Sequence, residues 1–209
     1  MVLLVYLFQK QGWVEIRNAL QQISAGHFVL ALLLIFLFAL LTGSPALPQA
    51  GGELPRADTV VKPLTFVSLE PVPRGRAFEV AVVAEIIPGF HINANKVLED
   101  YLIPTTIEAD PPKGLKVVEI VYPKASLQKF EFANAKMAVY DGSVTIRIKL
   151  MAEADAPLGE MTLPVRLRYQ ACNDKACLPP VRKNLSANFQ VVAAGTTARE
   201  IHAEIFKKK

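Results

Sequence analysis

Residues 161–192 read MTLPVRLRYQACNDKACLPPVRKNLSANFQVV and hold both cysteines of the 209-residue chain. Apolar and polar residues alternate before the cysteines, in 161–169, and after them, in 181–192. This period of two is typical of half-buried β-strands. Four residues separate Cys172 from Cys177. The stretch therefore predicts two strands joined by a short turn with a cysteine on each side.

The residues between and after the cysteines favour this turn. Asn173 and Asp174 are turn formers. Pro179 and Pro180 remove two backbone donors and keep the exit of the turn from pairing as a central strand. Two cysteines at the base of such a turn can approach within the ~4.4–6.8 Å Cα separation that a disulfide needs.

Three interpretations of this pair compete. A structural cross-link gains little from so short a loop, and a chain of this length can bury a core without it. A zinc site usually needs four ligands at paired spacings, and His27, His91 and His202 stand far from the cysteines. A redox pair fits because a tight, turn-borne bridge tends to be reducible. The spacing disfavours metal and leaves the cross-link and the redox pair open.

The rest of the chain predicts further strands separated by turn signals. These runs are 64–69, 77–87, 102–109, 115–122 and 144–151. Asp141-Gly142 gives a hairpin signal just before the last run. Seven or more short strands with one polar face each predict an all-β fold, an antiparallel β-sandwich.

The first 50 residues differ from the rest and are expected to lie outside the sandwich. Residues 28–41 form an unbroken apolar run, shorter than the ~20 residues of a membrane span and suited to a signal-peptide core. Small residues follow at 44–46, where signal peptidase would cut. The alternative is a membrane anchor at 28–41, supported upstream by one apolar helical face. That face comprises Trp13, Ile16, Leu20 and Ile23. We expect an exported, periplasmic protein and favour the cleaved signal peptide over an inner-membrane anchor.

Three further parts follow this leader. Residues 51–62 predict a linker rich in Gly, Pro and charge, and 63–193 the β-sandwich domain. Residues 194–209 predict a short C-terminal helix, over about 198–207, and a basic tail. The helix is expected because residues 197–200, TARE, have the spacing of a capping box.

Composition excludes several functions. A net charge of +4, from 23 basic and 19 acidic residues, gives no case for nucleic-acid binding. No Ser/His/Asp set, glycine-rich phosphate loop or carboxylate pair stands out, so we expect no cofactor and no hydrolytic or metal-dependent chemistry. Two cysteines in an exported chain fit an oxidising compartment.

Three stretches occur in a familiar order. They are YQACNDKACLPP at 169–180, GFHINAN at 89–95 with YLIPT at 101–105, and FEF at 130–132 with VYDG at 139–142. Together they resemble the N-terminal periplasmic domain of the thiol:disulfide interchange protein DsbD, a DsbC-like disulfide-bond corrector domain. The resemblance covers about 63–192. It implies an immunoglobulin-like sandwich, which agrees with the strand pattern.

The resemblance also implies the chemistry of the site. Cys172 and Cys177 would exchange their disulfide with partner thiols. Cys177 would form the mixed disulfide and Cys172 would resolve it, an order that the sequence itself does not give. An aromatic side chain would shield the sulfurs, with Phe132 the first candidate and Phe130 the second. The alternative is that both phenylalanines belong to the core.

Four other residues are expected near the site. Tyr169 should point into the core, and Pro179 borders the turn. Glu131 would raise a nearby thiol pKa by like-charge repulsion, although a solvated carboxylate is favoured. His91 suggests an acid or base, but a structural histidine with satisfied hydrogen bonds at a strand end is favoured.

Partners follow from the resemblance alone. A thioredoxin-like domain or membrane disulfide reductase would supply electrons to periplasmic disulfide-containing proteins, including those of cytochrome c biogenesis. No apolar run of spanning length follows Leu41 and no Cys-x-x-Cys occurs, so we expect dependence on such a donor. As an enzyme, the chain would be a disulfide reductase module. The alternative is a non-catalytic binding or chaperone domain of the cell envelope whose disulfide only braces a turn.

Overall fold

The computed structural model describes residues 25–41, 54–130 and 135–207. The chain divides into two compact units, 1–53 and 54–209. The first contains helix α3 (Ala25–Leu41), which includes the apolar run predicted at 28–41. Among the described residues, no helix has both the length and the apolar content needed to cross a membrane. The helical face predicted upstream, from Trp13 to Ile23, lies outside the described residues.

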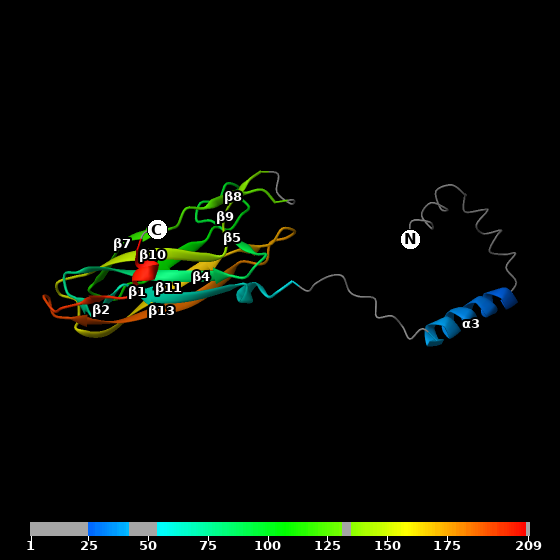
Figure 1. Ribbon diagram of the computed structural model, residues 1–209, viewed down its shortest axis with the longest axis horizontal. Helices are drawn as coiled ribbons and strands as arrows, with labels where there is room; N and C mark the ends of the chain where they lie inside the picture. The colour runs from blue at the N-terminus through cyan, green and yellow to red at the C-terminus, as the bar shows by residue number, and fades with distance from the viewer. Residues whose placement is uncertain (1–24, 42–53, 131–134, 208–209) are drawn as a thin grey trace. The chain divides into compact units, whose positions relative to one another are not determined.

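The second unit is a β-sandwich whose two long sheets pack face to face (Figure 1). The first sheet has the order β1-β4-β10-β7 and pairs antiparallel throughout. Its strands are β1 (Val61–Val67), β4 (Ala77–Ile86), β10 (Ser143–Ala152) and β7 (Leu115–Val121). The second sheet has the order β3-β13-β11-β6, with β3 alone parallel to its neighbour. Its strands are β3 (Val72–Pro73), β13 (Val181–Val192), β11 (Gly159–Tyr169) and β6 (Thr106–Ala109).

The core between the two sheets comes from the alternation seen in the sequence. The buried residues of β10 are Val144, Ile146, Ile148, Leu150 and Ala152, and those of β11 are Leu163, Val165, Leu167 and Tyr169. Phe78 of β4 and Phe189 of β13 meet edge-to-face with ring centroids 5.0 Å apart, which packs one sheet on the other. The predicted antiparallel β-sandwich is confirmed, and its architecture is immunoglobulin-like.

A third, smaller sheet lies at one end of the sandwich (Figure 1). Its strands, in order, are β12 (Ala171–Cys172), β5 (His91–Asn93), β9 (Met137–Tyr140) and β8 (Ser126–Gln128). Ile92, Ala171 and Tyr140 belong to the main core. Met137 and Val139, on the other face, form a second cluster with Leu102 and Phe130. The small sheet therefore buries apolar side chains on both of its faces.

Three local predictions are corrected. The first strand begins at Val61 rather than Leu64, because Val60 and Val61 are already buried in the core. The strand predicted over 102–109 is paired only from Thr106, since Leu102 instead joins the second cluster. Asp141-Gly142 does not close a hairpin: β9 and β10 lie in different sheets, and the chain crosses between them here.

The helix predicted over 198–207 is wrong in its first half. Arg199 and Glu200 form strand β14 (Arg199–Glu200), antiparallel to β2 (Leu69–Glu70). The Ile201 amide donates to the Ser68 carbonyl at 3.0 Å, so the backbone here is committed to strand pairing. Only helix α4 (Ala203–Phe206) follows, after His202 in a left-handed conformation with φ of 54°. In the basic tail, Lys208 and Lys209 lie outside the described residues.

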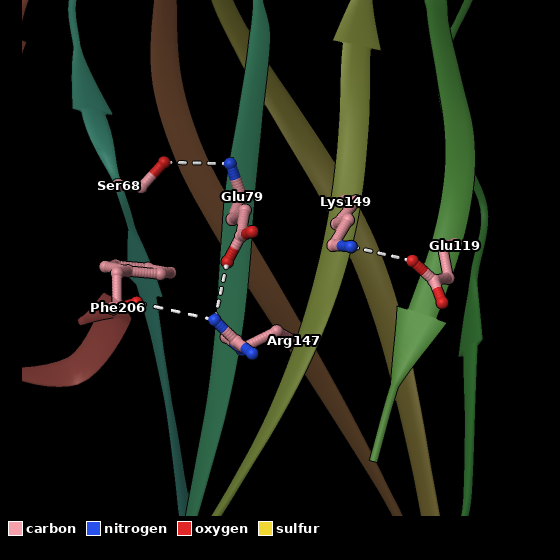
Figure 2. Close-up of polar contacts among 6 residues, drawn as sticks. All are labelled: Ser68, Glu79, Glu119, Arg147, Lys149 and Phe206. Carbon is pink, nitrogen blue, oxygen red and sulfur yellow. Dashed lines mark hydrogen bonds and ion pairs between the residues drawn. The ribbon is translucent and has the colours of Figure 1, made fainter. Parts of the chain in front are cut away.

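The C-terminal segment packs on the outer, polar face of the first sheet. Arg147 of β10 lies 3.6 Å from the Glu79 carboxylate of β4 and donates to the Phe206 carbonyl at 3.4 Å (Figure 2). On the same face, Lys149 and Glu119 form a 2.7 Å ion pair. This exposed ion pair contributes little to stability. Arg147, by contrast, ties α4 to the sheet, which shows that a strand face predicted to be solvated is partly covered.

Gly114 lies in the turn before β7, at a close approach of two backbones. Its φ is +87°, and a Cβ there would overlap Ala156 Cα. Gly142 also has a positive φ, +61°, but no atom of the described residues lies within 4 Å of its Cβ position. We expect Gly114→Ala to lower the free energy of unfolding by about 1–3 kcal/mol more than Gly142→Ala, because only the first adds steric overlap. Urea unfolding of both variants measures the difference, and equal losses would contradict the close approach.

Candidate functional site

The two cysteines form a disulfide across a tight turn. The S–S bond is 2.03 Å long, and the Cα atoms of Cys172 and Cys177 are 3.9 Å apart, paired as an isolated antiparallel bridge. Asn173 shapes the turn, because its Oδ1 accepts from the amides of Lys175 at 2.9 Å and Ala176 at 2.8 Å. The turn is therefore ordered by local hydrogen bonds, and the disulfide closes a loop that its own sequence already favours.

The turn is anchored to the small sheet on one side only. Cys172 and Ala171, as β12, pair with His91 and Ile92 of β5. The Leu178 amide donates to the Ala171 carbonyl at 2.8 Å, which closes the base of the turn. Because residues directly opposite in a ladder point to the same face, Cys172 and His91 share a face of this sheet.

The two sulfur-bearing residues differ sharply in exposure. Cys172 is 0% exposed, whereas Cys177 is exposed to solvent. The reason is position: Cys172 lies in a paired strand, and Cys177 lies on the returning arm of the turn outside that strand. A disulfide with one accessible and one covered sulfur can be attacked from solvent at only one end.

Gln170 holds the turn to the elements around it. Its Oε1 accepts from Asn93 Nδ2 and from the Ile103 amide, both at 3.2 Å. Its Nε2 donates to the Leu178 carbonyl at 3.3 Å. The Gln170 side chain thus joins β5, the segment around Ile103 and the exit of the cysteine turn. Neither Gln170 nor Asn93 was predicted as a site residue from the sequence, although both lie in the quoted motifs. The usable signal was that Gln170 stands two residues before Cys172 and so shares its face.

His91 lies against Phe130, which belongs to the second apolar cluster. Their rings are stacked, with centroids 4.1 Å apart and planes 15° from parallel. His91 is 4% exposed and Phe130 is 8% exposed. Burial lowers the pKa of His91 below 6.5, while Asp174 and Asp141 act in the opposite direction.

Two buried polar atoms on this face of β5 have no hydrogen-bond partner among the described residues. They are His91 Nε2 and Asn93 Oδ1. An unpaired buried polar atom is costly and calls for an explanation. The favoured prediction that His91 is fully satisfied is therefore wrong at Nε2.

The other predicted site residues are distributed as follows. Tyr169 lies in the main core, and its hydroxyl donates to the Ala57 carbonyl at 3.2 Å. Pro179 is exposed just after the buried Leu178. Phe132 and Glu131 lie outside the described residues. The structure thus brings Cys172, Cys177, His91 and Phe130 together at one end of the sandwich, and it places the Tyr169 side chain on the core side.

The family described as "Thiol:disulfide interchange protein DsbD, N-terminal" matches residues 58–188, well over half of the chain. A comparison with curated protein sequences finds no match.

Solved structures with similarity include the N-terminal domain of DsbD from Neisseria meningitidis in its reduced form. That domain is 20% identical with a TM-score of 0.37, over 65% of this chain and 89% of that one. The N-terminal periplasmic domain of ScsB from Proteus mirabilis is 15% identical with a TM-score of 0.44, over 66% of this chain and 50% of that one. A complex between the DsbD N-terminal and PilB N-terminal domains from Neisseria meningitidis gives 18% identity and a TM-score of 0.39, over 66% and 88%.

An immunoglobulin-like sandwich with a half-exposed disulfide at one end defines a thiol–disulfide exchange module of the β-sandwich class. The match over 58–188 makes the assignment specific: the chain belongs to the family of DsbD N-terminal domains. The resemblance seen in the sequence is confirmed.

Gln170→Ala tests how the turn is held. The change removes three hydrogen bonds and leaves the Ile103 amide without its acceptor. We expect the free energy of unfolding to fall by about 1–3 kcal/mol. Gln190→Ala is the control, because Gln190 is exposed on β13 and its loss should stay within about 0.5 kcal/mol. Urea unfolding measures both, and equal losses would show that the network adds nothing.

The lowered pKa of His91 predicts a pH dependence of stability. The unfolded state binds a proton at His91 more readily than the folded state, so stability is fully present above the unfolded pKa near 6.5 and is lost as pH falls through the folded pKa. His91→Phe should therefore reduce the drop in unfolding free energy between about pH 7.5 and about pH 5.5. His202→Phe is the control, since His202 packs on Phe66 away from the site. An unchanged drop in His91→Phe would contradict the prediction.

Proposed function

We propose that Cys177 is the sulfur that partner thiols attack and that Cys172 is the leaving group. The observation that carries this order is the difference in exposure: Cys177 is exposed and Cys172 is 0% exposed. A partner thiolate attacks Cys177 Sγ, the bond between Cys172 and Cys177 breaks, and Cys172 leaves with the electron pair. The partner's second thiol then attacks its own sulfur in the mixed disulfide and releases Cys177. The two partner thiols are thereby oxidised to a disulfide, and the Cys172–Cys177 disulfide is reduced to two thiols.

The reverse sequence would pass the electrons onward. Cys177 thiolate attacks an acceptor disulfide, and Cys172 then attacks Cys177 Sγ and releases the reduced acceptor. We propose a thioredoxin-like domain or membrane disulfide reductase as the donor and periplasmic disulfide-containing proteins as acceptors. In support, a solved relative is described in complex with the PilB N-terminal domain. The exposed turn offers such a partner the only sulfur it needs to reach.

The aromatic shield is also part of the proposal. We assign it to the segment carrying Phe130 and Phe132. Phe130 supports the assignment because it stacks on His91, the cross-strand neighbour of Cys172. An apolar cover over the buried sulfur would slow small oxidants and leave Cys177 to a docking partner.

We place the domain in the periplasm, reached through an N-terminal signal. The apolar helix α3 supports this placement, with residues 28–41 as a signal-peptide core or an inner-membrane anchor. The solved relative ScsB is likewise described by its periplasmic N-terminal domain. The proposed organisation keeps the leader at 1–50 and the C-terminal piece at 194–209. It shortens the predicted linker from 51–62 to 51–59 and starts the exchange domain, predicted at 63–193, at residue 60, because Val60 and Val61 are buried in the core and β1 begins at Val61.

Single-cysteine variants test the order of the two sulfurs. The probe is a thioredoxin that retains only its attacking cysteine, activated as its thionitrobenzoate mixed disulfide. We expect Cys172→Ser, which keeps Cys177, to form the covalent complex at least about tenfold faster than Cys177→Ser, because the remaining sulfur must be accessible. Non-reducing gel electrophoresis over time measures the rates.

The matched control is wild type in its disulfide form, which should give no covalent complex with this probe. Equal rates for the two variants, or faster complex formation by Cys177→Ser, would reverse the assignment. Failure of wild-type disulfide to accept electrons from intact reduced thioredoxin would leave only a structural cross-link.

A further inference from the structure

The reaction leaves one proton without a destination inside the protein. When Cys172 resolves the mixed disulfide it must attack as a thiolate, since the thiolate is the nucleophile. Cys172 is 0% exposed, and burial disfavours the charged form of a thiol. Solvent therefore cannot take this proton directly, and a buried acceptor near Cys172 is required.

His91 is placed to be that acceptor. It lies directly opposite Cys172 in the pairing of β5 with β12, where side chains share a face and Cβ atoms stand ~4.5–5.5 Å apart. Its ring is stacked on the ring of Phe130, with centroids 4.1 Å apart. The imidazole is thus fixed beside the cysteine by a strand pair and an aromatic contact.

The unpaired nitrogen gives His91 the capacity to accept. Nε2 is buried and has no hydrogen-bond partner among the described residues. Desolvation lowers the pKa of His91, so the ring is neutral at neutral pH and one of its nitrogens carries a free lone pair. Buried polar atoms are normally hydrogen-bonded, and His91 Nε2 is not. A role in proton transfer at the neighbouring Cys172 would explain why this nitrogen is left unpaired.

The charged groups around the ring favour the transient imidazolium. Asp174, on the cysteine turn, and Asp141, after β9, both act to raise the pKa of His91 against the effect of burial. Their field stabilises a proton on the ring for the duration of the step without holding it there at neutral pH.

We propose that His91 Nε2 accepts the Cys172 thiol proton as Cys172 attacks the mixed disulfide on Cys177. The Cys172–Cys177 bond forms, the bond from Cys177 to the partner breaks, and the partner leaves as a thiolate. The proton passes from His91 to solvent or to the departing thiolate as the partner separates. No external oxidant or reductant is needed, because the electrons move only between sulfurs.

This inference rests on the proposed function, and its test separates the two steps. Reduced protein is mixed in stopped flow with 5,5′-dithiobis(2-nitrobenzoate), a small disulfide that releases a coloured thiolate at each step. The first release reports attack by Cys177, and the second reports resolution by Cys172. Both rates are measured as a function of pH in wild type, His91→Phe, His91→Gln and His202→Phe.

In wild type the second rate should level off at pH values above the His91 pKa, because the acceptor is then neutral. At about pH 7 the second rate should fall about tenfold or more in His91→Phe, which keeps the aromatic stacking but loses the nitrogen. It should then rise with pH as Cys172 ionises on its own. His91→Gln, which is polar but not basic, should behave like His91→Phe. The first rate, and both rates of His202→Phe, should match wild type.

Two results would overturn the inference alone. One is a normal first rate with a second rate in His91→Phe and His91→Gln within twofold of wild type at every pH. The other is a wild-type second rate that rises about tenfold per pH unit through neutrality, as for an unassisted thiol. This second test needs no variant to fold. A first release that is absent in wild type would instead overturn the proposed function, because neither cysteine would then exchange with a disulfide.

Discussion

The pairing of a two-residue strand, Ala171–Cys172, with β5 is the constraint on which the site depends. It fixes one arm of the cysteine turn in a sheet and leaves the other arm outside. Because the disulfide spans only five positions in sequence, its two ends cannot be far apart in space. The two ends differ in position: Cys172 lies in the ladder and is 0% exposed, whereas Cys177 lies outside it and is exposed. The difference between two chemically identical residues therefore follows from where strand pairing places each of them.

The small sheet can support this asymmetry because both of its faces are packed. Ile92 and Ala171 join the main core, which fixes the sheet to the sandwich. On the opposite face Met137 and Val139 form a separate cluster with Phe130 and Leu102. A surface hairpin with one solvated face would be free to shift. Here a shift of one residue would exchange the two faces, and both faces would lose their packing.

The polar atoms of the site are tolerated within this packing for different reasons. Gln170 makes hydrogen bonds to three partners and so connects the cysteine turn, β5 and the segment around Ile103. His91 is stacked but unpaired at Nε2. A protein of this size could replace such a histidine by an apolar residue at lower cost, so the histidine is a candidate for a role in chemistry rather than in stability.

The sequence by itself determined the sandwich, most of its strands and the cysteine turn. These depend on local patterns: alternation in β10 and β11 selects the core face, and Asn173 with the prolines shapes the turn. Sequence also led to Phe130 and His91, but as separate candidates with different expected roles. Their stacking joins residues 39 positions apart, which no local period encodes.

Only the tertiary structure decided which sulfur is exposed, and it overruled the C-terminal prediction. Residues 197–200 have helix-capping chemistry, yet 199–200 pair with β2 because a neighbouring strand offers backbone partners. Strand pairing is non-local, so it depends on what lies beside a segment and not on the segment's own residues. For the same reason the exposure of Cys177, the burial of Cys172 and the unpaired nitrogen of His91 became visible only once β5, β9 and β12 were brought together at one end of the sandwich.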